Sequence, residues 1–181
     1  MTPRKIKCRT CKQPFARQNS LQVVCSMACA IEYSKATRAK IEAKEYRAKR
    51  EAMKTRQTWL REAQAVVNAY VRARDARLPC VSCDMPATWD GQWHASHFRS
   101  VKAASAIRFN LWNIHKSCSV CNNWKSGNLS EYEPKLREKI GDEKVDWLRT
   151  QSHARAYDIE YLKRIKKIFT KKLKTIQCRM R

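Results

Sequence analysis

The feature that most constrains this chain is the spacing of its nine cysteines. Two or three residues between paired cysteines let both sulfurs reach one ion, and two such pairs complete a tetrahedral thiolate site. In a reducing compartment this spacing favours zinc over disulfides or unliganded thiols, which are the alternatives. The sequence therefore predicts two structural Zn²⁺ sites and one spare thiol, Cys178. The pairs are Cys8 with Cys11, Cys25 with Cys29, Cys80 with Cys83, and Cys118 with Cys121.

The charge of the chain indicates a polyanionic partner. Its 181 residues include 39 Lys+Arg against 16 Asp+Glu, a formal net charge of +23. Nucleic acid is the leading candidate, ahead of an anionic membrane surface. No apolar run approaches the ~18 residues of a membrane span. The first residues also lack the apolar core of a secretory signal. We therefore expect a cytoplasmic protein with no membrane partner.

Shifts in composition divide the chain into four expected segments. Residues 1–33 form a four-cysteine zinc module. Residues 34–57 carry nine basic against three acidic side chains with no Gly or Pro, which predicts a basic helical linker or phosphate-binding arm. Residues 58–130 form the chemical core with its preceding helix, and residues 131–181 form a basic helical region.

Helical periodicity is clearest on either side of the core. The apolar stripe is predicted to pack against the second metal module, and consists of Trp59, Ala63, Val66, Val67 and Tyr70. Beyond the core, Glu133 and Pro134 are expected to start a helix that Gly141 ends. Asp142 would open another helix, and residues 161–173 would form a last amphipathic one.

Residues 80–130 combine the side chains that phosphodiester hydrolysis requires. They contain three of the four histidines, with oxygen-donor side chains and Lys/Arg nearby. Such a reaction needs a base for water, a cation near the leaving oxygen and positive charge around the phosphate. A lone histidine is more often structural, and two histidines three apart could bind another zinc. We expect four tryptophans of this segment to belong to the core, with base-stacking platforms as the alternative, namely Trp89, Trp93, Trp112 and Trp124.

The combined motif resembles a known group of proteins. It reads Cys80-x2-Cys83, His97, then Asn113-x-His115-x2-Cys118-x2-Cys121-Asn122-x2-Lys125. This pattern resembles an HNH nuclease of the four-cysteine subtype. The added stretches Arg108-Phe109-Asn110 and Lys125-Ser126-Gly127-Asn128 make residues 80–130 similar to the NinG (Rap) recombination proteins of lambdoid phages. The N-terminal module and basic linker fit that layout, so the resemblance covers most of the chain.

The resemblance implies a ββα-metal fold within a mainly helical α+β protein. His97, on the first strand, would be the general base for water. Asn113 would orient that histidine. Asn122, on a helix beginning near Cys121, would ligate a catalytic Mg²⁺ or Mn²⁺, since its amide oxygen suits a hard cation. The zinc held by the second cysteine cluster would be structural.

Two further histidines are candidates for the same site. Many HNH enzymes place an acidic or histidine ligand directly before the base, but Ser96 stands there. His94 has the right chemistry as a metal ligand. It would need a bulge to meet His97, because positions 94 and 97 of a regular strand face opposite ways. Asp90 is the reserve ligand. His115 could contact the scissile phosphate as a further catalytic residue, or fill the site.

We expect a phage protein that acts as a metal-dependent endonuclease in the bacterial cytoplasm. Family resemblance implies branched DNA recombination intermediates, Holliday junctions and D-loops, as substrates. Arg99 or Lys125 would neutralise the phosphorane. A two-fold homodimer would suit symmetric cutting. The alternatives are a non-catalytic zinc protein that binds DNA or RNA, such as a mediator or regulator, and a ribosome-associated RNA-binding protein. The flanking residues expected to grip DNA include Lys44, Arg47, Arg50, Lys167 and Lys171.

Overall fold

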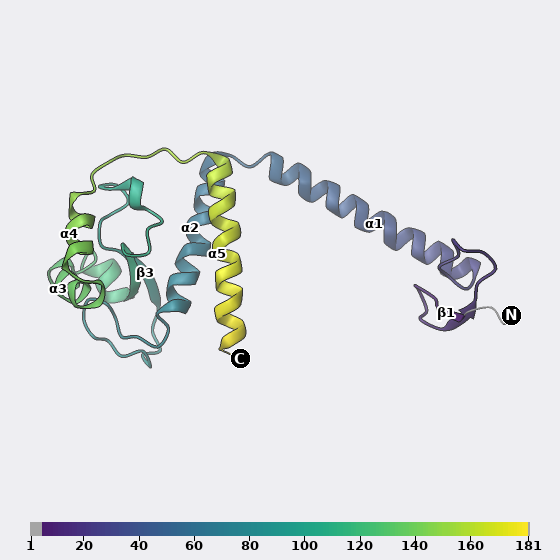
Figure 1. Ribbon diagram of the computed structural model, residues 1–181, viewed down its shortest axis with the longest axis horizontal. Coiled ribbons are helices and arrows are strands. Elements are labelled where there is room, and N and C mark those ends of the chain that lie inside the picture. The colour runs from purple at the N-terminus through teal and green to yellow at the C-terminus, as the bar shows by residue number, and fades with distance from the viewer. Residues whose placement is uncertain (1–4, 181) are drawn as a thin grey trace. The chain divides into compact units, whose positions relative to one another are not determined.

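The computed structural model describes residues 5–180. These residues divide into two compact units, one ending at Lys54 and the other beginning at Thr55. Each unit contains one two-stranded antiparallel sheet, and helices form most of the rest (Figure 1). The expected α+β, mainly helical class is therefore confirmed. Within residues 5–180, no helix combines the length and the apolar character that spanning a membrane requires.

The first unit is a small hairpin followed by a long helix. Strands β1 (Lys5–Lys7) and β2 (Pro14–Ala16) pair antiparallel. Helix α1 (Met27–Ala52) begins inside the expected metal module, because the Ser26 side chain caps it by accepting a hydrogen bond from the Cys29 N–H at 3.3 Å. None of the helix's residues is buried. Its basic side chains are thus presented to solvent around the whole helix.

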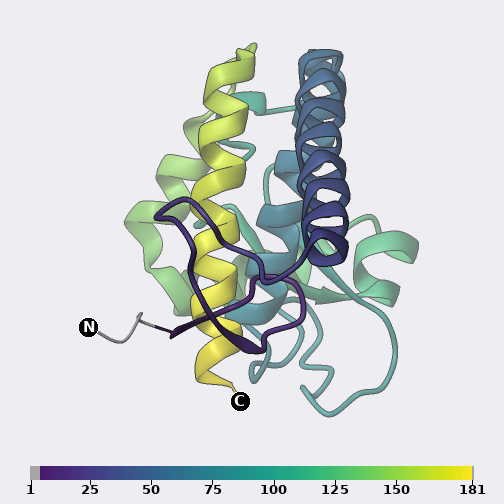
Figure 2. The same cartoon turned by 90° about the vertical axis from the view of Figure 1, so that its right-hand side faces the viewer.

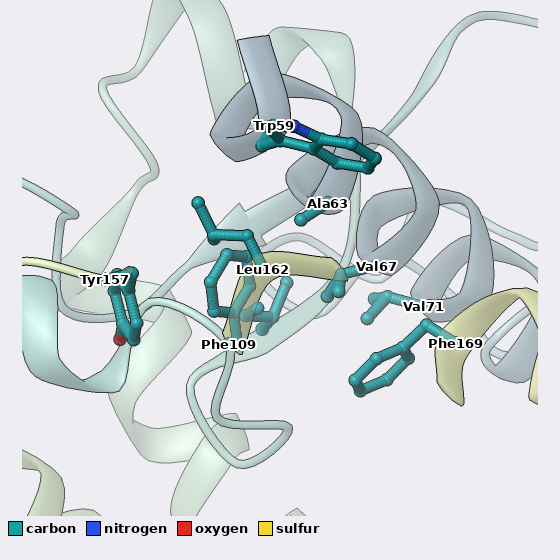
Figure 3. Packing of buried hydrophobic residues seen from close by; sticks show 9 residues of the cluster. Trp59, Ala63, Val67, Val71, Phe109, Tyr157, Leu162 and Phe169 are labelled. Carbon is teal, nitrogen blue, oxygen red and sulfur yellow. The ribbon is translucent and has the colours of Figure 1, made fainter. Parts of the chain in front are cut away.

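In the second unit, two long helices pack side by side. Helices α2 (Arg56–Arg74) and α5 (Ile159–Arg179) lie together in both views (Figures 1 and 2). The expected apolar stripe of α2 is buried, but it packs mainly against α5 and not against the metal module. The sequence could not select this partner, because α5 follows α2 by more than 80 residues. Figure 3 shows eight labelled side chains of this core, Trp59, Ala63, Val67, Val71, Phe109, Tyr157, Leu162 and Phe169.

Within the second unit, a hairpin lies between this helix pair and the other helices (Figure 1). Strands β3 (Trp93–His97) and β4 (Ile114–Cys118) pair antiparallel in unbroken register, with His97 opposite Ile114. Helix α2 covers one face, where Ile114 joins the α2–α5 core. Helix α3 (Leu129–Ile140) covers the other, and its Tyr132 hydroxyl donates to the Ser96 carbonyl at 3.2 Å.

The segment after β4 departs from the expected helix near Cys121. It forms a π-helix of five residues, η2 (Val120–Trp124), before α3 begins at Leu129. Helix α3 thus starts four residues before the expected Glu133 and contains Pro134. Gly141, at φ +89°, ends it as expected, and α4 (Asp142–Thr150) follows. A short 3₁₀ turn, η1 (Ser105–Ile107), lies in the loop between the strands.

Candidate active site and metal centres

The second cysteine cluster gathers at the end of the hairpin. Cys80 and Cys83 come from the loop before β3, Cys118 ends β4, and Cys121 lies in η2. Their four sulfurs all lie within 4.8 Å of one another, with the Sγ atoms of Cys83 and Cys118 3.6 Å apart. A tetrahedral zinc with Zn–S bonds of about 2.3 Å separates its sulfurs by about 3.8 Å. The cluster therefore has the size of a four-thiolate zinc site.

Sulfur atoms of this cluster receive hydrogen bonds from the surrounding chain. The backbone N–H groups of Ser82 and Cys118 donate to the Cys80 sulfur at 3.4 and 3.3 Å. Burial alone would raise the pKa of the Cys80 thiol, but these donors lower it to about 7. The Asn128 side chain donates to the Cys121 sulfur at 3.7 Å. Donors directed at sulfur are what a bound metal needs around its thiolate ligands.

The first cluster has the same size. The Cys25 sulfur lies 3.6 Å from that of Cys11 and 3.7 Å from that of Cys29, and Cys8 completes a group within 4.8 Å. Cys29 belongs to the first turn of α1, so a metal here would join the hairpin to the helix. The predicted grouping of eight cysteines into two clusters is thus confirmed, and either cluster could hold Zn²⁺.

His97 ends strand β3 with its two ring nitrogens in different environments. Its Nε2 lies 3.0 Å from the Arg108 carbonyl oxygen. Because a carbonyl can only accept, Nε2 carries the proton and Nδ1 carries the lone pair. Among the described residues, Nδ1 has no hydrogen-bond partner. It is not fully buried, so it reaches solvent. Burial of the ring lowers the pKa of His97 below its usual value, which keeps it neutral at pH 7.

Asn113 fixes the chain just beyond His97. Its side chain is fully buried. Its Oδ1 accepts from the Arg99 N–H at 2.7 Å, and its Nδ2 donates to the Arg99 carbonyl at 3.0 Å. Asn113 could therefore serve the expected positioning role, but it would act through the backbone of Arg99, two residues after His97. No hydrogen bond joins its side chain to the imidazole.

His94 does not share a face with His97. The register is continuous from Trp93 to His97, with no bulge, so positions 94 and 97 project to opposite sides of the hairpin. The idea that both histidines serve one site is therefore not supported by this geometry. His94 Nε2 is buried without a partner among the described residues. The reserve ligand Asp90 is exposed in the loop before β3.

His115 is held in a buried network and not presented to a substrate. It is 2% exposed. Its Nε2 donates to the Trp112 carbonyl at 3.0 Å, and its Nδ1 lies 3.1 Å from Arg74 Nη2. With both ring nitrogens engaged, the expected contact with a scissile phosphate cannot form in this conformation. His115 is a structural residue here.

The centre of that network is a carboxylate that the sequence did not single out. Asp75 is 2% exposed and accepts from Arg74 at 2.9 and 2.7 Å and from the Lys116 N–H at 3.1 Å. Burial would raise its pKa, but the hydrogen bonds and charge of Arg74, with the charge of Lys139, hold the pKa well below its usual range. Asp75 thus clamps the end of α2 to β4. The sequence signal that could have found Asp75 is weak: it is an acidic residue at the end of a predicted helix in a strongly basic chain.

The other predicted site residues make no hydrogen bond to His97 in the described part of the chain. Asn122 donates through Nδ2 to the Asn123 side chain at 2.8 Å, which leaves its Oδ1 without a partner among the described residues. Lys125 is exposed directly after η2. Arg99 is half-buried and donates to the Gln151 carbonyl at 3.3 Å. The expected grip residues are all exposed, Lys44, Arg47 and Arg50 on α1 and Lys167 and Lys171 on α5.

The four tryptophans of this segment divide into two kinds. Trp89 and Trp93 are half-buried against the second cysteine cluster, with ring centroids 5.3 Å apart. Trp112 and Trp124 are 42% and 84% exposed. The prediction that all four are core was therefore wrong for these two, because hydrophobic character alone does not separate core from surface aromatics.

Comparisons with known proteins point to one family. A family model described as "Bacteriophage Lambda NinG protein" matches residues 1–178. The NinG protein of Escherichia phage lambda is 44% identical over 126 residues, which is 70% of this chain and 61% of that protein. The NinG protein of Salmonella phage P22 is 42% identical over the same shares. The match thus spans about three fifths of these relatives. No solved structure is significantly similar.

Proposed function

The chain belongs to the NinG family, and from this we propose that its second unit is a metal-dependent DNA endonuclease of the HNH type. Its substrates would be branched recombination intermediates. The observation that carries the proposal is the state of His97. Its imidazole is neutral, its tautomer is fixed by the Arg108 carbonyl, and its free Nδ1 reaches solvent.

These are the properties that a general base for water requires. A base must be unprotonated at the working pH and must direct a lone pair at the water it activates. His97 Nδ1 would take the proton from a water molecule while that water attacks phosphorus. The Asn113 clamp on Arg99 would hold the strand end in place during this step.

Asn122 is the residue that would hold a hard divalent cation. Its unpartnered Oδ1 is the type of oxygen donor that Mg²⁺ and Mn²⁺ prefer. Such a cation, when bound, stabilises negative charge on the departing oxygen. His94 faces away from His97, so the proposal leaves it outside this site.

The charge of the chain supports DNA as the partner. The exposed basic residues of α1 and α5 would bind the phosphates of duplex arms, while Arg99 and Lys125 would lie nearer the cut. Two basic helices in two compact units suit a branched substrate, which offers more than one arm.

The direct test is cleavage of an end-labelled four-way junction with Mg²⁺ or Mn²⁺. We expect the wild type to cut the junction and His97→Ala to bind it without cutting. His153→Ala is the matched control, since this exposed histidine lies between α4 and α5. Binding without cleavage by the wild type would support the rival function, a non-catalytic zinc protein that binds DNA. Equal cutting of duplex, junction and RNA would contradict the preference for branched DNA.

A further inference from the structure

A cavity of about 330 Å³ lies beside the loop whose Arg108 carbonyl accepts the hydrogen bond from His97. It falls at the lower end of the size range of small-ligand sites. The first turn of α5, the end of α4 and the loop between the strands form its walls. Its lining is mostly aromatic and apolar, with two amide side chains. The residues used below are Phe109, Asn110, Trp147, Gln151, Tyr157 and Tyr161.

The aromatic side chains form a layered wall. Tyr157 and Tyr161 stack with centroids 5.0 Å apart and planes 22° apart, and Phe109 lies 5.1 Å from Tyr157. Trp147 is 41% exposed and packs its edge against Trp112 at 5.8 Å. Trp147 and Tyr161 are the partly exposed rings of this wall, whereas Phe109 and Tyr157, at 7% and 4% exposed, support them from the core. A partly exposed ring can stack on a flat aromatic ligand.

Two amides in this wall have unused hydrogen-bonding groups of opposite kind. Asn110 accepts from the Trp112 N–H at 2.8 Å through Oδ1, which leaves its Nδ2 as a donor. Gln151 donates through Nε2 to the Trp147 carbonyl at 3.2 Å, which leaves its Oε1 as an acceptor. Among the described residues, neither free group has a partner. A ligand with both donors and acceptors on its edge would match them.

The rim of the cavity is cationic. The guanidinium of Arg155 lies 5.2 Å from the Tyr157 ring and 4.9 Å from the Tyr161 ring, and Arg164 lies 5.3 Å from the Tyr161 ring. An aromatic ligand that carries phosphates would meet positive charge on entering.

The cavity is also tied to the candidate catalytic residue. The Arg108 carbonyl accepts from His97, and the next two residues, Phe109 and Asn110, line the cavity. We propose that this cavity binds an unpaired nucleobase at the branch point of the DNA, with the adjoining phosphates on Arg155 and Arg164. The inference rests on the proposed DNA partner. A base at a branch point has lost part of its stacking and is easier to unpair than a base inside a continuous duplex, so such a site would favour branched DNA.

The test is a comparison of two DNA junctions that differ by one base. One has a single unpaired thymidine at the branch, and the other has an abasic residue there. Dissociation constants are measured by fluorescence anisotropy without added divalent cation, so that cleavage plays no part. Loss of a base–aromatic stack weakens binding about 5- to 150-fold. The wild type should therefore prefer the thymidine junction by a factor in this range.

Three variants locate the effect. Trp147→Ala should bind both junctions equally, and Trp147→Phe should keep most of the preference. Trp124→Ala, which removes an exposed ring outside the cavity, should keep the full preference. Equal binding of both junctions by the wild type, or a full preference in Trp147→Ala, would overturn the inference. A preference without any cleavage would refute the nuclease proposal alone, whereas cleavage without a preference would refute only this inference.

Discussion

Replacing Asp75 with Asn should destabilise the second unit strongly. The carboxylate is 2% exposed and joins the end of α2 to β4 through Arg74 and the Lys116 N–H. Asn keeps the shape but removes the charge, and its amide N–H₂ must face donors. Arg74 would then be left partly buried without its anion.

The size of the effect follows from that burial. Breaking a buried ion pair by removing one partner costs about 3–5 kcal/mol. With a urea dependence of about 1–3 kcal/mol per M, the midpoint of unfolding should fall by at least about 1 M. Asp84→Asn is the matched control, because its carboxylate is 71% exposed and, within residues 5–180, forms an ion pair only with Lys135 at the surface. Such a surface pair contributes at most about 1 kcal/mol.

The pH dependence gives an independent check. The pKa of Asp75 is lowered on folding, so the unfolded chain binds more protons between the two values. Its stabilising contribution is complete above the unfolded pKa of about 3.9 and is lost as the pH falls below it. Urea midpoints of the wild type should drop in this acid range more steeply than those of Asp75→Asn. A midpoint for Asp75→Asn equal to that of Asp84→Asn would refute the role assigned to this clamp.

Three further predictions concern metal, pH and salt. Removing zinc with a chelator should lower the melting temperature and reduce the helical circular dichroism signal, because structural zinc contributes about 10–16 kcal/mol to folding; an unchanged melt of metal-free protein would contradict the zinc sites. The rate of junction cleavage should rise with pH through the lowered pKa of His97 and level off at neutral pH, since only the neutral ring accepts a proton; a midpoint above about 6.5 would be inconsistent with a buried base. Junction affinity should fall steeply with salt, and the double variant Lys167→Ala/Lys171→Ala should reduce the slope of log K against log salt by about 2; an unchanged slope would exclude α5 from the DNA interface.

Local spacing made the metal clusters and most helices predictable from sequence. Each cysteine pair lies within one turn of chain, and the stripe from Trp59 to Tyr70 is set by helical periodicity. Gly141 ends α3 because a positive φ is easiest for glycine. The stripe and the helix end depend on residues close together in the chain, and each cysteine pair needs a second pair because a tetrahedral site takes four ligands.

Apart from the metal clusters, features that join distant segments were not predictable. Asp75 meets Lys116 across 41 positions, and α2 packs against a helix near the C-terminus. The spacing of His115 in the motif is the same whether its side chain faces a substrate or the core. Only its contacts with Arg74 and Trp112 show that it faces the core. The exposure of Trp112 depends on the path of the loop between the strands, which periodicity does not specify.

Chemical rescue of His97→Ala tests the central claim most directly. A proton acceptor in the transition state contributes about 10²- to 10⁴-fold, so single-turnover junction cleavage should fall by this factor. Added imidazole should restore part of the rate in proportion to its neutral fraction, while zinc content and junction affinity stay at wild-type values. A His97→Ala protein that cuts the junction at the wild-type rate without imidazole would contradict the claim.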